Sequence, residues 1–252
     1  MATPNNNITT PTTASNVLWF VPNLIGYTRV LMTLSGFFLM TAFPDSRWLA
    51  GILLYTGSFV GDLLDGVAAR RLDQTSQFGG VLDMITDRCS TVGLLYVLAE
   101  EYSAVDKELP LPFFRLTFLA LMMLDISSHW CQMYSSLSVG AHHKSEEGNV
   151  GKNFLVRWFY AYYWFFGYLC VGAEFTYILL YVRRHLDVAA TAYSFLGANV
   201  LDIVLATCIP GCIAKQAVNV MQLTSACHTI AQYDADQRNK QQVGNDVNRK
   251  NN

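Results

Sequence analysis

Four aspartates at fixed spacing lie between Gly61 and Ser90, and they are the side chains of this sequence best suited to chemistry. The stretch reads Asp62-x-x-Asp65-Gly66-x-x-Ala69-Arg70, then eight residues, then Gly79-x-x-x-Asp83-x-x-x-Asp87. Residues three and four apart share one face of an α-helix. Each half of the pattern therefore predicts a helix with two carboxylates in one stripe, beside residues that have almost no side chain.

This residue set indicates metal-dependent phosphate chemistry. Four close carboxylates repel one another, and a hard divalent cation relieves that repulsion. Oxygen ligands suit Mg²⁺ or Mn²⁺, and four carboxylates could hold two such ions about 4 Å apart. Ions of this kind commonly neutralise charge that develops on phosphoryl oxygens. Arg70 adds a planar fork suited to phosphate, and Gly66, Ala69 and Gly79 leave room for a bulky group against the backbone.

The elements that must position these carboxylates are apolar segments long enough to cross a bilayer, for which about 20 residues are needed. Six such segments lie near 22–43, 48–68, 81–99, 113–134, 156–182 and 195–223. The aspartate stripes fall in the second and third segments, which span only if the helices continue through the charged turns. The loop at 71–78 would make these helices antiparallel neighbours, so their stripes can face each other. We predict an all-α polytopic membrane protein with a six-transmembrane-helix bundle.

The composition agrees with a membrane protein. Of the 252 residues, 52% are hydrophobic and 14% are charged, whereas soluble proteins carry roughly 25% charged residues. The net charge of −2, without a basic block, argues against nucleic-acid binding. The six cysteines show no zinc-binding spacing. We expect a polar disordered tail at 1–16, a membrane domain at 17–232 and a polar C-terminal tail at 233–252.

The basic residues indicate how the bundle is oriented. With six spans, both termini, the 69–80 loop and the 135–155 loop lie on one side, which carries more Lys and Arg than the other. The positive-inside rule places that side, and with it the aspartate stripes, in the cytoplasm. The sequon Asn7-Ile8-Thr9 is then expected to stay unmodified, because glycosylation occurs in secreted or lumenal segments.

The aspartate pattern matches the signature of the CDP-alcohol phosphotransferases at every defined position, and the chain resembles this family over about residues 17–240. The likeness includes Phe20-Val21-Pro22-Asn23-Leu24-Ile25-Gly26-Tyr27, Leu124-Asp125, Ser128-His129-Trp130 and Pro210-x4-Lys215, and it is weaker at 139–153. The resemblance implies a six-helix, usually homodimeric membrane enzyme that uses Mg²⁺ or Mn²⁺. Such enzymes transfer a substituted phosphoryl group from a CDP-linked donor to an alcohol and release CMP.

Within the family, the chain is similar to eukaryotic members of the endoplasmic reticulum that use CDP-diacylglycerol as donor and myo-inositol as acceptor. By position, the resemblance makes Asp62, Asp65 and Asp83 metal ligands. It makes Asp87 both a metal ligand and the general base that accepts the proton of the acceptor hydroxyl. The CDP site it implies consists of Asn23, Asp65, Gly66, Ala69, Arg70 and Gly79.

Further ionisable residues lie inside the apolar segments, where their cost makes a function or a buried pairing the usual explanation. Asp125 and His129 are four residues apart and could bind inositol hydroxyls, or form a structural pair. Lys215 could bind inositol or pair with Glu174. Arg29 is expected to pair with a carboxylate of the signature rather than to contact substrate.

Two alternatives remain open from the sequence, and a third is disfavoured. The acceptor could instead be inositol phosphate, glycerol 3-phosphate or serine. Intramembrane aspartates also bind transported cations, so a cation transporter is the alternative from a different class. Transporters commonly show internal repeats and broken helices at mid-membrane, whereas this sequence shows no repeat and its aspartates lie near helix ends. A catalytically silent family member is disfavoured by the intact four-aspartate pattern.

Overall fold

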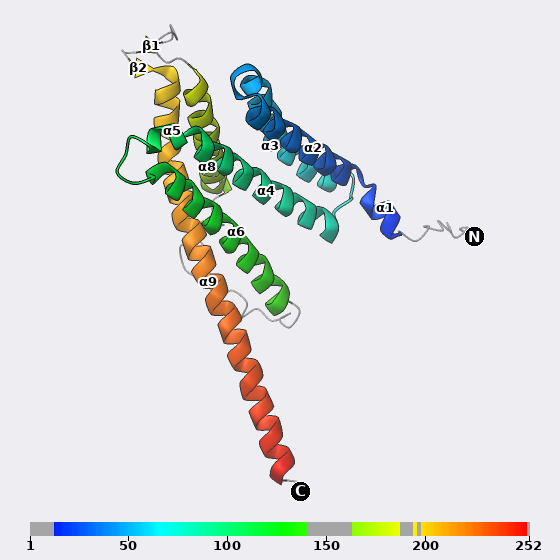
Figure 1. The fold of residues 1–252 in the computed structure, drawn as a ribbon. Coiled ribbons are helices and arrows are strands. Elements are labelled where there is room, and N and C mark those ends of the chain that lie inside the picture. The colour runs from blue at the N-terminus through cyan, green and yellow to red at the C-terminus, as the bar shows by residue number, and fades with distance from the viewer. Residues whose placement is uncertain (1–12, 141–162, 187–193, 196–197, 251–252) are drawn as a thin grey trace, which may run out of the picture. The chain divides into compact units, whose positions relative to one another are not determined.

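The structure is a computed structural model that describes residues 13–140, 163–186, 194–195 and 198–250 (Figure 1). Its helices are α1 (Ala14–Leu18), α2 (Val21–Ala42), α3 (Pro44–Arg71), α4 (Gln77–Glu101), α5 (Ser103–Asp106), α6 (Phe113–Gly140), α8 (Tyr163–His185) and α9 (Val200–Lys250). Two-residue strands, β1 (Ser194–Phe195) and β2 (Ala198–Asn199), pair antiparallel. The predicted all-α class is confirmed for the described residues, in which this short pair of strands is the only β-structure.

The chain divides into two compact units, Met1–Ser90 and Thr91–Asn252. In the first unit, α2 and α3 pack side by side along their length (Figure 1). Phe43 alone separates them, and Pro44 opens α3 at a position where its missing N–H costs nothing. A Cβ atom on Gly36 would lie 2.9 Å from the carbonyl oxygen of Gly51, so the absence of side chains lets the two backbones approach closely.

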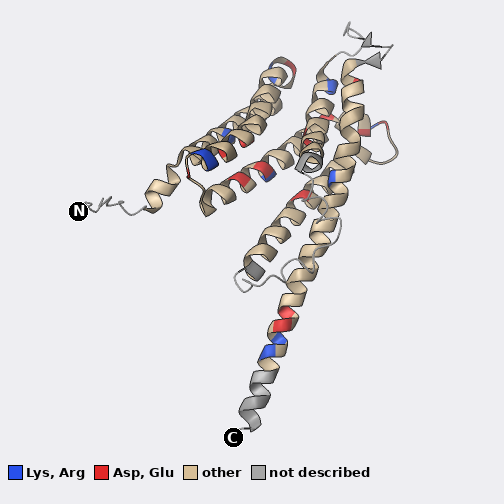
Figure 2. Cartoon of the chain, turned by 180° about the vertical axis from the view of Figure 1, so that it is seen from behind, with Lys and Arg blue, Asp and Glu red and all other residues tan. Residues whose placement is uncertain are grey.

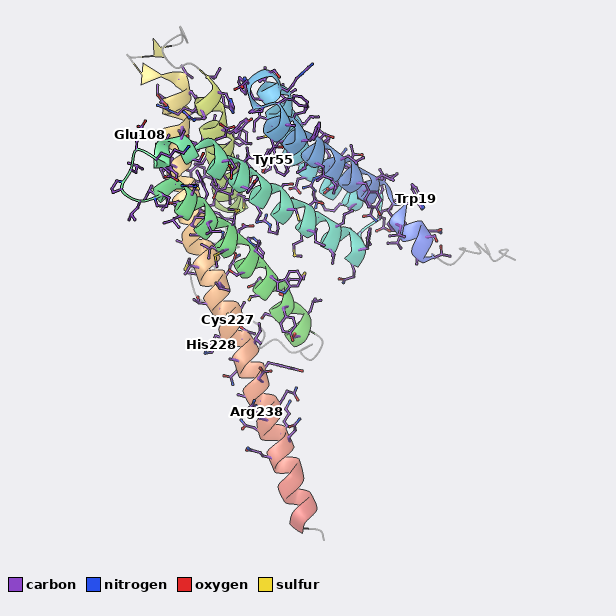
Figure 3. All side chains as sticks on the ribbon, viewed as in Figure 1. Trp19, Tyr55, Glu108, Cys227, His228 and Arg238 are labelled. Carbon is purple, nitrogen blue, oxygen red and sulfur yellow. The ribbon has the colours of Figure 1, made fainter. Side chains whose placement is uncertain are left out.

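Tyr55 lies in the apolar core of this first unit. Its side chain is fully buried, and those of Met40 and Ile52 are buried as well. Tyr55 is labelled in Figure 3. The Tyr55 ring contacts the ring of Phe37 with centroids 5.7 Å apart. This packing joins α2 to α3 in the half of the pair that lies away from the aspartates.

A tight linker at residues 72–76 joins α3 to α4. Asp73 adopts a left-handed conformation with φ of 54°, which aspartate tolerates better than most residues. Ser76 precedes α4, and its Oγ accepts a hydrogen bond from the N–H of Gly79 at 3.0 Å, which satisfies one unpaired donor of the first helical turn. The linker corresponds to the loop predicted at 71–78.

In the second unit, α9 packs against both α6 and α8 (Figure 1). A Cβ atom on Gly172 would lie 3.4 Å from Cα of Gly211, so small residues again allow close helix contact. Fully buried leucines of α4 and α8 form part of its core. Pro210 interrupts the backbone hydrogen bonding of α9, and the Tyr168 hydroxyl donates to the nearby carbonyl oxygen of Thr207 at 2.9 Å.

Among the described residues, three helices are long and apolar enough to cross a bilayer: Val21–Ala42, Pro44–Arg71 and Val200–Gln242. Helix α2 exposes Leu31, Leu34 and Phe38 but buries Arg29 and Thr33, the reverse of a soluble protein. Figure 2 shows long uncharged stretches on α2 and α9. The six apolar segments predicted from the sequence each overlap a described helix, although the start of the fifth, 156–182, lies outside the described residues and the sixth, 195–223, becomes helical only at Val200, after β1 and β2.

Helix α9 is much longer than the apolar segment predicted at 195–223. Its 51 residues extend for about 75 Å, whereas a bilayer core is about 30 Å thick. The excess contains the polar residues from 233 onward, where Arg238 is labelled in Figure 3. The polar C-terminal segment therefore continues the helix through Lys250.

Candidate active site

The four signature aspartates converge in the first unit, as the two stripes predict. Asp62 and Asp65 come from α3, and Asp83 and Asp87 come from α4. All four carboxylates contact the guanidinium of Arg29, which comes from α2. The nitrogen–oxygen distances are 2.9 Å to Asp62, 2.6 Å to Asp65, 2.8 Å to Asp83 and 2.5 Å to Asp87.

Arg29 is held at this place by its surroundings as well as by the carboxylates. Its side chain is only 3% exposed. Its Nε donates to the carbonyl oxygen of Ser58 at 3.2 Å, and Ser58 Oγ donates to the carbonyl oxygen of Arg29 at 3.0 Å. A Cβ atom on Gly61 would lie 2.9 Å from Arg29 Cγ, so the glycine makes room for the arginine side chain. The prediction that Arg29 pairs with a signature carboxylate is confirmed.

The donor set fits a hard divalent cation. Asp62, Asp83 and Asp87 each offer a carboxylate oxygen, and these oxygens lie within 4.8 Å of one another. Carboxylate oxygens are the ligands that Mg²⁺ and Mn²⁺ prefer. Asp65 lies outside this group of three, and its carboxylate contacts Arg29. The role of all four aspartates as metal ligands stays a prediction.

A pocket of about 210 Å³ opens beside the carboxylates, between the start of α2, the end of α3 and the start of α4. Of the six residues predicted to bind CDP, five line it: Asn23, Asp65, Gly66, Ala69 and Gly79. The sixth, Arg70, is adjacent, because its Nη1 lies 3.5 Å from the place of a Cβ atom on Gly66. The structure thus brings the predicted set together around one cavity.

Close contacts determine the shape of this pocket. A Cβ atom on Gly79 would lie 2.9 Å from Asn23 Oδ1, and one on Gly26 would lie 2.8 Å from Leu82 Cδ2. The Asn23 amide donates to the carbonyl oxygen of Val17 at 2.5 Å, which fixes its side chain. Glycine at these positions therefore preserves space that a methyl group would fill.

The linker contributes pocket residues that sequence reasoning missed. Gln74, Thr75 and Ser76 all line the cavity. Gln74 Oε1 also accepts a hydrogen bond from the backbone N–H of Val21 at 2.9 Å, which ties the linker to the start of α2. The sequence offered one indication that these residues could line the site, because they lie among the eight variable residues between the two halves of the signature.

The predicted inositol-binding residues belong to the second unit. Asp125 is buried on α6, and its Oδ1 lies 3.7 Å from Nδ1 of His129, so these two residues do form an intrahelical pair. Lys215 is buried on α9, and its Nζ donates to Asn219 Oδ1 at 2.6 Å. Contact of Asp125, His129 or Lys215 with inositol stays a prediction.

Comparisons with known proteins agree with this site. The sequence model of the CDP-alcohol phosphatidyltransferase family matches residues 19–196. The chain is 36% identical over 235 residues to the probable CDP-diacylglycerol–inositol 3-phosphatidyltransferase 2 of Arabidopsis thaliana, covering 91% of this chain and 97% of the relative. It is 35% identical over 243 residues to the CDP-diacylglycerol–inositol 3-phosphatidyltransferase of Saccharomyces cerevisiae, covering 94% and 97%.

The corresponding enzyme of Schizosaccharomyces pombe is 34% identical over 237 residues, covering 88% of this chain and 93% of the relative. No solved structure matches the fold significantly. The match of the family model contains the whole four-aspartate signature, and the relatives cover nearly the full chain. On these grounds the chain belongs to the CDP-alcohol phosphatidyltransferase family.

Proposed function

We propose that this protein transfers the phosphatidyl group of CDP-diacylglycerol to myo-inositol, and so makes phosphatidylinositol and CMP. The observation that carries the reaction type is the convergence of the four signature carboxylates beside a pocket lined by Asn23, Gly66 and Gly79. The inositol acceptor is supported by relatives of that name in plants, fungi and animals.

The chain's own residues supply positioning and proton transfer. The pocket beside Asp65 and Gly66 binds the cytidine diphosphate part of the donor, and the diacylglycerol part stays in lipid. Asp87 accepts the proton of an inositol hydroxyl as its oxygen attacks, in line, the phosphorus that carries diacylglycerol, and CMP leaves. When bound by Asp62, Asp65, Asp83 and Asp87, Mg²⁺ or Mn²⁺, two ions to a site, would neutralise charge on the pyrophosphate oxygens.

The acceptor is assigned to a second group of residues. Asp125, His129 and Lys215 are buried or half-buried polar side chains on apolar helices, and such residues can bind polyol hydroxyls. Their position on apolar helices supports this role, because ionisable groups within such helices are commonly functional.

The setting of the reaction completes the proposal. The protein is a six-span bundle of the endoplasmic reticulum membrane, acts as a homodimer, and has both termini and the active site in the cytoplasm. This topology is supported by the described helices, which overlap all six apolar segments of the sequence, and by the distribution of basic residues. A cytoplasmic site at the membrane surface can receive both a lipid donor and a water-soluble acceptor.

The test uses purified protein in detergent with CDP-diacylglycerol, Mn²⁺ or Mg²⁺, and labelled inositol. The wild type should transfer label into lipid only when metal is present, and Asp87→Asn should reduce the rate about 10³-fold, within the range for loss of a general base. Arg47→Gln, an exposed change at the far end of α3, serves as the control and should keep the wild-type rate.

Each alternative has its own result in the same preparation. Turnover with glycerol 3-phosphate, serine or inositol phosphate but not inositol would keep the family chemistry and overturn the acceptor. Undiminished labelling by Asp87→Asn would remove Asp87 as the base. Metal flux into proteoliposomes without any turnover of CDP-diacylglycerol would favour the cation transporter instead.

A further inference from the structure

Arg29 is the one side chain that contacts all four signature carboxylates in the described part of the chain. One guanidinium nitrogen, Nη1, contacts Asp65 and Asp83, and the other, Nη2, contacts Asp62 and Asp87. The guanidinium thus lies at the centre of the group of carboxylates that fits a divalent cation. No role in the transfer reaction described above uses this residue.

The position of Arg29 is built by the fold. Its Nε is fixed by the carbonyl oxygen of Ser58, and its backbone carbonyl receives the Ser58 hydroxyl. The same hydroxyl accepts a hydrogen bond from Thr33 at 2.8 Å. The missing side chain of Gly61 provides the space through which the Arg29 stem passes. These contacts hold the stem, while the two terminal nitrogens face only carboxylates among the partners given above.

Four carboxylates gathered around one point repel one another strongly unless a cation lies between them. The Arg29 guanidinium supplies one positive charge and five N–H donors in a planar fork. A divalent cation would need the oxygens of Asp62, Asp83 and Asp87, which are the carboxylates that Arg29 contacts. The guanidinium and the ion therefore compete for the same ligands.

We propose that Arg29 is an exchangeable internal counter-cation, which neutralises the aspartates in the metal-free protein and yields their oxygens when the divalent cation binds. The inference rests on the metal dependence of the proposed function. Because part of the binding free energy of the metal goes into separating Arg29 from the carboxylates, Arg29 weakens the apparent metal affinity. It also keeps α2, α3 and α4 together when metal is absent.

The experiment measures Mn²⁺ binding to the full-length protein in detergent, without lipid substrate, from the electron paramagnetic resonance signal of free Mn²⁺. Arg29→Gln removes the competing charge, and its Kd for Mn²⁺ should fall about tenfold below that of the wild type. The reason is that, in the wild type, the state with Arg29 separated from the carboxylates is the one that binds metal, and it is a minor state. Arg47→Gln removes the same charge at the exposed end of α3 and should leave the Kd unchanged.

Thermal unfolding gives a second measurement on the same samples. Without metal, Arg29→Gln should unfold at a lower temperature than the wild type, because its carboxylates have lost their counter-cation. Saturating Mn²⁺ should then raise the unfolding temperature of the variant more than that of the wild type. A residue that only shapes the metal site would give the opposite result, with weaker binding and a smaller rise.

An unchanged or higher Kd in Arg29→Gln, with normal binding by the wild type, overturns this inference and leaves the proposed function intact. A wild type that binds no Mn²⁺ overturns both. If Arg29→Gln does not fold, Arg29→Lys decides the matter. The lysine ammonium has only three donors and cannot contact four carboxylates. The Kd of Arg29→Lys for Mn²⁺ should therefore also fall below the wild-type value. A Kd at or above the wild-type value overturns the proposal.

Discussion

At the scale of single residues, the candidate site depends on glycines, which have no side chain, as much as on the side chains that line it. Gly61 leaves space for Arg29, and Gly79 leaves space for Asn23 in the pocket. The space beside Gly66 is less restricted, because the three nearest atoms all belong to the flexible end of Arg70 and lie 3.5 Å or more away. Gly61 and Gly79 are therefore positions where one added methyl group should have a specific and local effect.

Gly79→Ala should weaken donor binding. The added methyl group would lie 2.9 Å from Asn23 Oδ1, so this side chain, which lines the pocket, must shift. Overpacking of this kind costs about 1–3 kcal/mol, so the KM for CDP-diacylglycerol should rise about tenfold, with a smaller change in kcat. Steady-state kinetics in mixed micelles, with the donor concentration varied, measure both constants.

Gly167→Ala provides the matched control, because no atom of the described residues lies within 4 Å of the added atom. Its KM and kcat should equal those of the wild type. A Gly79→Ala enzyme with an unchanged KM but a reduced kcat would contradict the placement of Gly79 in the donor pocket.

At the scale of elements, the start of α6 is anchored by a residue of the preceding helix. Asp106 on α5 accepts hydrogen bonds from the backbone N–H groups of Phe114 and Arg115 at 2.8 Å and 2.9 Å. The first N–H groups of a helix have no partner within the helix, so Asp106 caps α6 from outside it. Burial alone would raise the pKa of Asp106, but the hydrogen bonds from Arg115 and Phe114 outweigh it and lower the pKa.

Asp106→Asn should lower the thermal unfolding temperature at pH 7. Because the folded pKa of Asp106 is lowered, its stabilising contribution is fully present above the unfolded pKa, about 3.9, and is lost as pH falls through the folded value. The difference between wild type and variant should therefore shrink below about pH 4. Differential scanning fluorimetry across a pH series measures it.

Glu108→Gln is the control for this prediction, since Glu108 is an exposed residue of the same connection (labelled in Figure 3). Its unfolding temperature should follow that of the wild type at every pH. A constant difference between wild type and Asp106→Asn from pH 7 to pH 3 would show that the charge of Asp106 is not what stabilises α6.

At the scale of the whole molecule, the proposed function requires that the carboxylates and the donor's lipid chains meet at a membrane surface. Helices α2 and α3 expose leucine and phenylalanine to their surroundings and bury Arg29 and Asp65 between them. Both helices are long and apolar enough to cross a bilayer. This helix pair thus buries charged side chains of the site and exposes apolar ones, which suits a reaction with one lipid and one soluble substrate.

The proposed topology predicts that both ends of the chain are cytoplasmic. In eukaryotic cells the sequon at Asn7 should stay unmodified, so treatment with an N-glycosidase should cause no shift in mobility. A tag placed after Asn252 should be accessible to antibody when only the plasma membrane is permeabilised. A glycosylated Asn7, or a tag that needs full permeabilisation, would contradict this orientation.

The sequence by itself determined the local features. Spacing by three and four residues places Asp62 with Asp65, and Asp83 with Asp87, on helix faces, because the period of the α-helix is a local property. Runs of apolar residues predicted where the helices lie, because such runs are also a local property of the sequence. The linker between the two stripes made their helices neighbours, so the convergence of the four aspartates also followed from the sequence.

Only the tertiary structure decided which distant residues complete the site. Arg29 contacts carboxylates that lie 33 to 58 positions away in the sequence, and Gln74 bonds a backbone N–H 53 positions away. Such contacts depend on how closely α2 and α3 approach, which is determined by packing at glycines such as Gly36 and Gly51. Helical periodicity says which face a residue occupies, but the distance between two faces is decided only when the helices pack.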